Sequence, residues 1–238
     1  MWCEPYGLCF LVAKETLLRA FVYIDGFNLY YRMLKKRPDL KWLNPLQLSR
    51  EILGSKYNII QLNYYTARIS ARAHDPLAPA RQANYLKALS TVSGIHIHRG
   101  NFMTSEVWMP LATPPDARPL GYSWSFPTPD VVKVIKSEEK GSDVNLGVHL
   151  VRDAFLDKFD VAFVLTNDSD LVEPIRIVVQ EVDKRVGLFA PVKFPNASLK
   201  AAASFELHVR PHHLAMAQFP VQMQLEDGSF LSRPPEWS

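Results

Sequence analysis

Two carboxylates, Asp168 and Asp170, stand directly behind a short apolar run at residues 161–165. The run is continuous and rich in β-branched and aromatic residues, which predicts a buried strand, and the spacing of apolar residues over 171–182 predicts a helix. Open α/β sheets bind their ligands at the carboxyl ends of their strands, so these acids could hold a cation there. The alternative is that Asp168 and Ser169 only cap the helix, although capping needs one such residue and a second acid adds repulsion. Both interpretations remain open from this segment alone.

The same arrangement recurs twice more along the chain. Asp25 follows a second apolar run at residues 21–24, and the Asn28 amide can hold a carboxylate or a water molecule. Asp143 falls in the first turn of a helix predicted over residues 144–155, with Ser142 as its N-cap. Clustered carboxylates are the ligands that hard divalent cations prefer, and without a cation they raise one another's pKa.

Strand and helix patterns alternate along the rest of the chain. Helices are predicted over 29–36, 45–53 and 79–92, strands over 58–69, 95–98 and 131–135, and a final strand over 185–190 followed by a small helix at 198–204. This alternation is typical of an α/β fold with a largely parallel sheet. Residues 104–129 are rich in proline and show no periodicity, which predicts a long loop. Its tryptophans could stack on unpaired bases or anchor the loop to the body.

Composition narrows the classes of protein. The chain has 238 residues, 47% hydrophobic and 21% charged, which are ordinary values for a folded domain. Cys3 and Cys9 are its two cysteines, so no disulfide framework or cysteine-based zinc site is available to the body, as suits a reducing cytoplasm. No apolar run is long enough to predict a membrane span or a signal peptide. Residues 1–20 are expected to be an extension, compatible with a translation start set too far upstream, and residues 211–238 a peripheral tail.

Charge is unevenly distributed along the chain. Residues 31–129 contain 13 Lys and Arg against 5 Asp and Glu, whereas residues 130–173 contain 5 against 10. A basic half beside an acidic cluster suits an anionic substrate delivered to a metal site. An unevenly charged, solvated surface explains the same counts equally well.

Three blocks carry a family resemblance. Residues 23–30 (YIDGFNLY), 138–145 (EEKGSDVN) and 166–171 (TNDSDL) resemble, in the right order, the motif blocks of the NYN domain family (LabA-like). That family belongs to the PIN-like superfamily of metal-dependent ribonucleases. The resemblance runs from about residue 21 to residue 191. It implies an α/β fold of the PIN-like type, a three-layer α/β/α sandwich with a mostly parallel central sheet, over a domain at 21–210 with a proline-rich insert at 104–129.

The resemblance also implies a function, a metal-dependent ribonuclease that hydrolyses RNA phosphodiester bonds. RNA would be the partner, the chain would be cytoplasmic without a membrane association, and a homo-oligomer is possible. The implied catalytic residues, which would hold one or two Mg²⁺ or Mn²⁺ ions, are Asp25, Asp143, Asp168 and Asp170. The implied substrate-binding residues are Asn28, which would orient Asp25 or a water molecule, together with Lys140 and Ser169.

Two other classes of function remain open. One is an RNA-binding regulator that keeps the acidic site without turnover. The other is an oxidoreductase that hydroxylates an aromatic or pyridine ring with NADH or flavin, an activity attached to some proteins resembling this family. The chain contains no glycine-rich dinucleotide fingerprint and no Walker motif.

Overall fold

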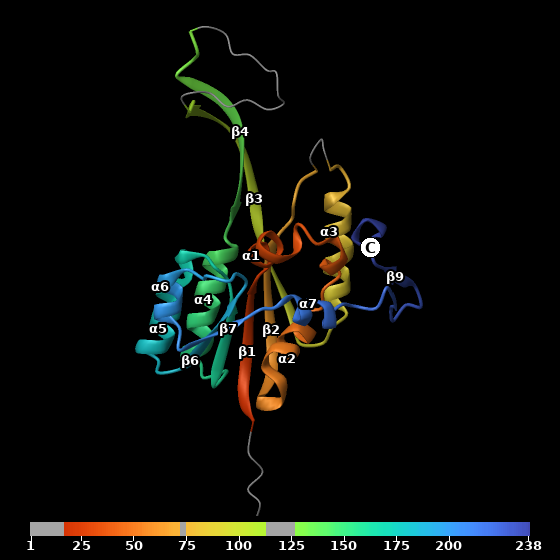
Figure 1. The fold of residues 1–238 in the computed structure, drawn as a ribbon, viewed down its shortest axis with the longest axis vertical. Helices are drawn as coiled ribbons and strands as arrows, with labels where there is room; N and C mark the ends of the chain where they lie inside the picture. Colours follow the sequence, from red (N-terminus) through yellow and green to blue (C-terminus); the bar gives the residue numbers. More distant parts are fainter. Residues whose placement is uncertain (1–16, 72–74, 113–126) are drawn as a thin grey trace, which may run out of the picture.

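The protein is built around a seven-stranded sheet with strand order β4-β3-β2-β1-β5-β6-β7 (Figure 1). The structure, a computed structural model, describes residues 17–71, 75–112 and 127–238. The neighbouring strands are parallel throughout except for β4, which runs antiparallel to β3. The strands of this sheet are β1 (Leu18–Asp25), β2 (Tyr57–Ala67), β3 (Ile95–Pro110), β4 (Val131–Lys140), β5 (Val161–Leu165), β6 (Arg185–Ala190) and β7 (Phe205–His208).

Helices cover both faces of the sheet, which confirms the three-layer α/β/α sandwich. On one face lie α2 (Pro45–Leu53), α3 (Ala78–Ser90) and α7 (Pro211–Met216), and on the other lie α4 (Ser142–Phe155), α5 (Val172–Gln180) and α6 (Ala197–Ala202). Asn44 caps α2, because its Oδ1 accepts hydrogen bonds from the backbone N–H groups of Leu46 and Gln47. The shorter helical turns are α1 (Gly26–Leu29), η1 (Tyr30–Leu34), η2 (Pro38–Leu40), η3 (Gly54–Lys56), η4 (Ser169–Leu171) and η5 (Pro235–Trp237). None of the helices within the described residues is long and apolar enough to cross a membrane.

Strand β1 explains why the apolar runs of this sequence are continuous rather than alternating. Val22 and Ile24 belong to the core under α2 and α3, whereas Phe21 and Tyr23 belong to the core under α4 and α5. A central parallel strand is buried on both faces, so residues 20–24 of β1 form a continuous apolar run.

The order of the strands reverses between β1 and β5. In open α/β sheets, ligands bind at such a reversal. The chain leaves β1 and continues to β2 on one side, whereas β5 pairs with β1 on the other side. Ile24 and Leu165, near the ends of β1 and β5, are directly paired. The two chain segments that follow these strands diverge toward opposite faces, which leaves the crevice where open α/β sheets bind ligands.

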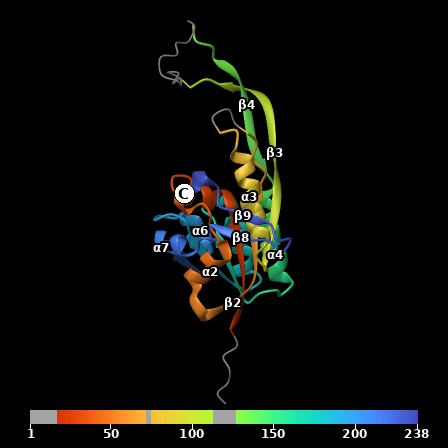
Figure 2. The same cartoon turned by 90° about the vertical axis from the view of Figure 1, so that its right-hand side faces the viewer.

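A two-stranded arm projects from this carboxyl edge of the sheet (Figures 1 and 2). It consists of residues 101–110 of β3 paired antiparallel with β4. The predicted loop over 104–129 is therefore wrong at its beginning, where β3 continues to Pro110; residues 113–126 lie outside the described ranges. Most side chains of the arm are exposed on both faces, including Trp108, so the sequence has no apolar alternation there to indicate a strand.

The end of the chain also differs from its prediction. Strand β7 follows β6, so residues 185–190 are not the final strand. The expectation of a peripheral tail after residue 210 is wrong, because Leu214, Phe219 and Leu231 are buried in the core and the Trp42 indole N–H donates to the Pro220 carbonyl at 2.8 Å. A small hairpin of β8 (Gln222–Gln224) and β9 (Phe230–Ser232) completes this region. Residues 1–16, most of the expected extension, lie outside the described residues.

Candidate metal and substrate site

Asp25 occupies the centre of the site, at the end of β1. Its side chain is 3% exposed and caps α1, because Oδ1 accepts the backbone N–H of Asn28 at 2.9 Å. Its Oδ2 accepts the Asn28 side-chain amide and, at 3.2 Å, the Thr166 hydroxyl. These three donors hold a buried carboxylate in one orientation and take the place of water at three of its roughly four acceptor sites.

The segment after β5 is tied to the same carboxylate. The Asn28 Oδ1 accepts the backbone N–H of Asn167 at 3.2 Å, and the Thr166 hydroxyl accepts the backbone N–H of Asp168 at 3.0 Å. Asp168 caps the next turn, because its Oδ1 accepts the backbone N–H of Asp170 at 3.1 Å. Asp168 therefore acts as a cap, but of the short turn η4 rather than of helix α5, and the cap engages one carboxylate oxygen through one N–H. A second role for the carboxylate at the mouth of the crevice remains compatible with it.

Asp143 lies on a different element, in the first turn of α4. The prediction of Ser142 as the N-cap is wrong: Gly141 holds that position with φ of 94°, a left-handed conformation that glycine adopts without strain. Ser142 is instead the first helical residue, and its backbone N–H donates to the Glu139 carboxylate at 3.0 Å. The sequence pattern could not separate the two positions because serine is acceptable at either.

The carboxylates interact electrostatically across the crevice. Burial, followed by the negative charges of Asp25, Asp168, Glu139 and Asp170, raises the pKa of Asp143 to about 7. Burial also raises the pKa of Asp25, although the hydrogen bonds from Asn28 and Thr166 oppose that shift. Such mutual effects require these acids to share one region of space.

No cationic side chain neutralises this group within the described residues, since none of the ion pairs there includes one of its five carboxylates. The donors are all oxygens, which suits a hard cation such as Mg²⁺ or Mn²⁺. In the described ranges, however, no three Asp, Glu, His or Cys side chains are arranged so that they could hold a metal ion. The ligand set of Asp25, Asp143, Asp168 and Asp170 therefore remains a prediction.

The three predicted substrate-binding residues differ in their surroundings. Asn28 forms hydrogen bonds with Asp25 and Asn167, so it holds the end of β1 and the segment after β5 in position. Ser169 is exposed beside Asp168 and Asp170. Lys140 is exposed at the end of β4 and forms an ion pair with Glu138 at 3.3 Å. Contact of any of the three with a substrate remains a prediction.

Glu139 and Thr166 belong to this site, and the sequence interpretation did not single out either of them. Glu139 lies inside the second motif block, four residues before Asp143, and Thr166 is the first residue of the third block. Their place in those blocks was the signal available. Gly100 on β3 provides room for Glu139, because a Cβ at that position would meet the Glu139 carboxylate and lie 2.7 Å from the Lys140 carbonyl oxygen.

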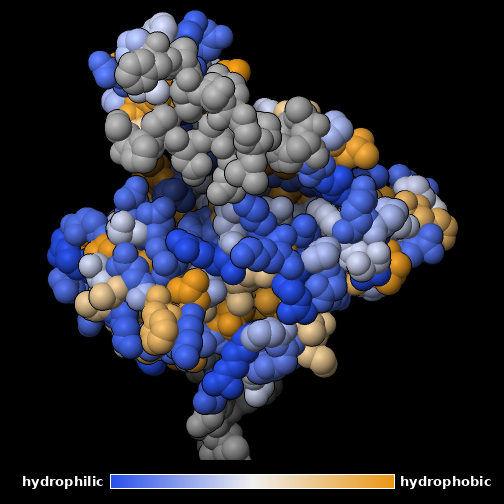
Figure 3. Space-filling model, turned by 45° about the horizontal axis from the view of Figure 1, so that its top comes forward, coloured by the Kyte–Doolittle hydropathy of each residue, from blue (hydrophilic) through white to orange (hydrophobic). Residues whose placement is uncertain are grey.

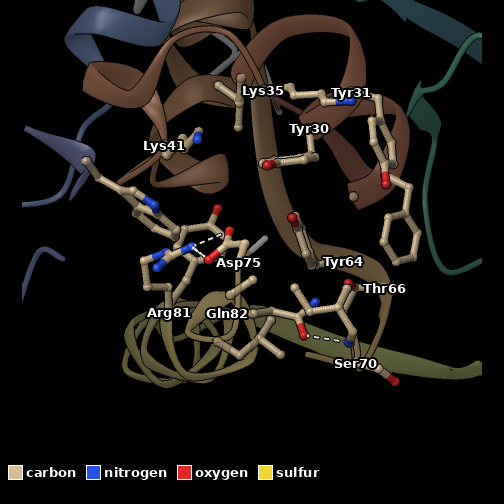
Figure 4. A pocket seen from close by; sticks show the side chains of 18 residues that line it. Tyr30, Tyr31, Lys35, Lys41, Tyr64, Thr66, Ser70, Asp75, Arg81 and Gln82 are labelled. Carbon is tan, nitrogen blue, oxygen red and sulfur yellow. Dashed lines mark hydrogen bonds and ion pairs between the residues drawn. The ribbon is translucent and has the colours of Figure 1, made fainter. Parts of the chain in front are cut away.

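Two further features border the acidic group. Phe27 of α1 packs edge-on against Phe102 at the base of the arm, with ring centroids 5.7 Å apart. A cavity of about 270 Å³ lies between α1, η1, the end of β2 and the start of α3 (Figure 4). With the arm side tilted forward, the visible surface of the body is mainly hydrophilic and is interrupted by apolar patches (Figure 3).

Residues 19–208 match the model of the NYN domain, so the chain belongs to the NYN domain family. Among characterised proteins, the chain is 29% identical over 230 residues to 6-hydroxy-3-succinoylpyridine 3-monooxygenase HspA from Pseudomonas putida strain S16, a match covering 85% of this chain and 70% of that protein. Among solved structures, a protein of unknown function from Vibrio parahaemolyticus matches with a TM-score of 0.49 and 14% identity, over 83% of this chain and 96% of that one.

Proposed function

We propose that this protein is a metal-dependent ribonuclease whose site holds one or two Mg²⁺ or Mn²⁺ ions on Asp25, Asp143, Asp168 and Asp170. The single observation that carries the proposal is the acidic group itself, which gathers at the strand-order reversal without a cationic partner among the described residues. Membership of the NYN domain family gives this group a nuclease context. Glu139 adds a fifth carboxylate beside Asp143.

The residues of the site would have different roles in hydrolysis. A divalent ion held by these carboxylates would lower the pKa of an attacking water and would neutralise charge that develops on the phosphodiester. Asn28 and Thr166 fix the orientation of Asp25, so the site is organised before a substrate arrives. The start of α4 places Asp143 where the helix dipole favours a negative charge.

RNA would approach as a polyanion, and the basic residues of the first half of the chain would steer it. Ser169 and Lys140 are the proposed phosphate contacts, with Lys140 exchanging its partner Glu138 for a phosphate oxygen. Counterion release predicts that RNA binding weakens steeply as salt rises. Affinity that does not change with salt would contradict a phosphate-based contact. A homo-oligomer and a cytoplasmic location are compatible with this function and are proposed with it.

The test is Mg²⁺- or Mn²⁺-dependent cleavage of single-stranded RNA by the wild-type protein and by Asp168→Asn. The amide keeps the capping oxygen but removes the charge, so the variant should fold normally while cleavage falls by a factor of about 10² or more. Asp183→Asn is the matched control, because Asp183 is exposed in the turn before β6 at the opposite edge of the sheet. Equal cleavage by the two variants would refute the proposal. RNA binding by a wild-type protein that cleaves with neither metal would instead identify a regulator.

A second candidate is a monooxygenase that hydroxylates a pyridine or related ring. Two observations favour it: the 29% identity to a 6-hydroxy-3-succinoylpyridine 3-monooxygenase over 85% of the chain, and the aromatic cavity beside α1. The assay is incubation with a hydroxypyridine, O₂ and NADH, with and without added flavin, followed by mass spectrometry. A gain of one oxygen atom in the product would support this candidate. An unchanged ring together with metal-dependent RNA cleavage would leave the nuclease.

A further inference from the structure

The cavity beside α1 is separate from the acidic group, although the two share α1 as a wall. Gly26, the residue after Asp25, lines the cavity, and a Cβ on Gly26 would meet the Tyr65 carbonyl oxygen and the Tyr64 ring. Helix α1 therefore packs directly on the end of β2, with the cavity on the side of α3. Neither Asp143 nor Asp168 lines it.

The walls of the cavity are unusually rich in aromatic rings. Tyr30 and Tyr31 come from η1 and Tyr64 from β2 (Figure 4). Tyr85 comes from α3 and Trp237 from the end of the chain. Rings with hydroxyl groups offer both flat apolar faces and hydrogen-bond donors, which together recognise a planar ring carrying polar atoms. The volume of about 270 Å³ lies at the low end for small-molecule sites, so it suits one ring system rather than a dinucleotide.

The charges on the walls favour an anion. Three cationic side chains line the cavity, Lys35, Lys41 and Arg81, against one carboxylate, Asp75. Arg81 is committed to Asp75 through both carboxylate oxygens and to Glu236 at 3.3 Å. That leaves Lys35 and Lys41 as the cationic side chains of the cavity that are available to an anionic ligand.

Lys35 and Lys41 lie over aromatic rings rather than beside acids. The Lys35 ammonium is 5.2 Å from the centre of the Tyr31 ring, and the Lys41 ammonium is 5.7 Å from that of Tyr30. Neither takes part in an ion pair among the described residues. Burial, assisted by the charge of Arg81, lowers the pKa of Lys41, so an anionic ligand beside its ammonium would relieve a cost that the protein alone leaves in place.

We propose that this cavity is a binding site for a planar heteroaromatic ring that carries an anionic group, with the ring between the tyrosines and the anion on Lys41. This chemistry has two sources, a ring carboxylate and a nucleotide with its base and phosphate. The ligand class follows from the walls of the cavity alone and does not depend on cleavage at the acidic group.

The experiment uses calorimetry on the full chain with three probes: nicotinate, adenosine monophosphate and inorganic phosphate. At least one of the two ring probes should bind more tightly than phosphate, and Lys41→Met should weaken that binding about tenfold, as expected for loss of a charge-assisted contact. Tyr30→Leu should weaken it as well, because it removes one ring wall. Lys56→Met is the matched control, since Lys56 is exposed in η3 at the opposite end of β2.

The two ring probes identify the source of the ligand. Preference for nicotinate indicates a ring carboxylate, and preference for the nucleotide indicates an unpaired base. Asp168→Asn should bind the preferred probe as the wild type does, so loss of nuclease activity and loss of this site are distinguishable. The proposal is overturned if phosphate binds as tightly as both ring probes, if no probe binds, or if Lys41→Met and Lys56→Met have equal affinities.

Discussion

Thr166→Val is the sharpest test of how the site is organised, because Thr166 is fully buried and its hydroxyl makes two contacts. The hydroxyl donates to Asp25 at 3.2 Å and accepts the backbone N–H of Asp168 at 3.0 Å. Valine keeps the shape of the side chain, so only these two contacts are lost. A hydrogen bond to a charged group contributes about 1.5–3 kcal/mol, and an orphaned N–H costs about 1–3 kcal/mol.

Because one hydroxyl serves both contacts, the two losses are not fully additive, and the expected decrease in the free energy of unfolding is about 2–3 kcal/mol. Thr166→Ser is the matched control: it keeps the hydroxyl and removes one buried methyl group, at a cost of about 1 kcal/mol. The assay is urea denaturation in the presence of a chelator, followed by the same measurement with Mn²⁺. Thr166→Val should have a lower free energy of unfolding than Thr166→Ser, and Mn²⁺ should raise that free energy less in Thr166→Val. A valine variant as stable as the serine variant, with an equal gain from Mn²⁺, would refute the role assigned to Thr166.

Three further predictions concern neighbouring positions. Gly100→Ala should weaken metal-dependent cleavage and lower the free energy of unfolding by about 1–3 kcal/mol, because its Cβ would displace Glu139; cleavage equal to wild type would contradict that placement. His98→Gln should reduce the loss of stability on acidification. Burial, then the charges of two other histidines, lowers the pKa of His98 to about 4, against about 6.5 unfolded. The neutral ring's contribution is thus complete above pH ~6.5 and declines toward pH 4, and urea midpoints that fall equally in both proteins would argue against it. Asp153→Asn should lower the free energy of unfolding by about 1–3 kcal/mol, because this carboxylate, 1% exposed, accepts from the Tyr23 hydroxyl and pairs with an arginine and a lysine; an unchanged urea midpoint would contradict this.

The sequence predicts the central sheet well because burial on both faces leaves a clear signal. Residues 161–165 form a continuous apolar run and residues 185–190 a mostly apolar one; both segments are predicted as strands, and both are strands with those bounds. The carboxylates that follow such runs can also be predicted as neighbours, because a parallel sheet brings the carboxyl ends of its strands to one edge. Asp25 and Thr166 are an example. Each follows one of the paired residues Ile24 and Leu165, so their side chains lie within hydrogen-bonding distance of each other.

The sequence predicts poorly where pairing or docking, rather than burial, decides the structure. Residues 104–110 continue β3 because β4 pairs with them, and with both faces exposed they carry no period-two pattern. Trp237 lines a cavity whose other walls come from residues 26–86, a contact that no local pattern encodes. The aromatic cavity escapes sequence analysis for this reason, since its walls come from five separate segments.

The most direct test of the central claim is the anomalous difference map of crystals soaked in Mn²⁺. The proposed metal site predicts a peak about 2.0–2.6 Å from carboxylate oxygens of Asp25 and at least one of Asp143, Asp168 and Asp170. Crystals of Asp143→Asn, soaked in the same way, should give a weaker peak or none. No peak at the acidic group in the wild-type crystals, or manganese bound elsewhere in its place, would contradict the claim that this group is a metal site.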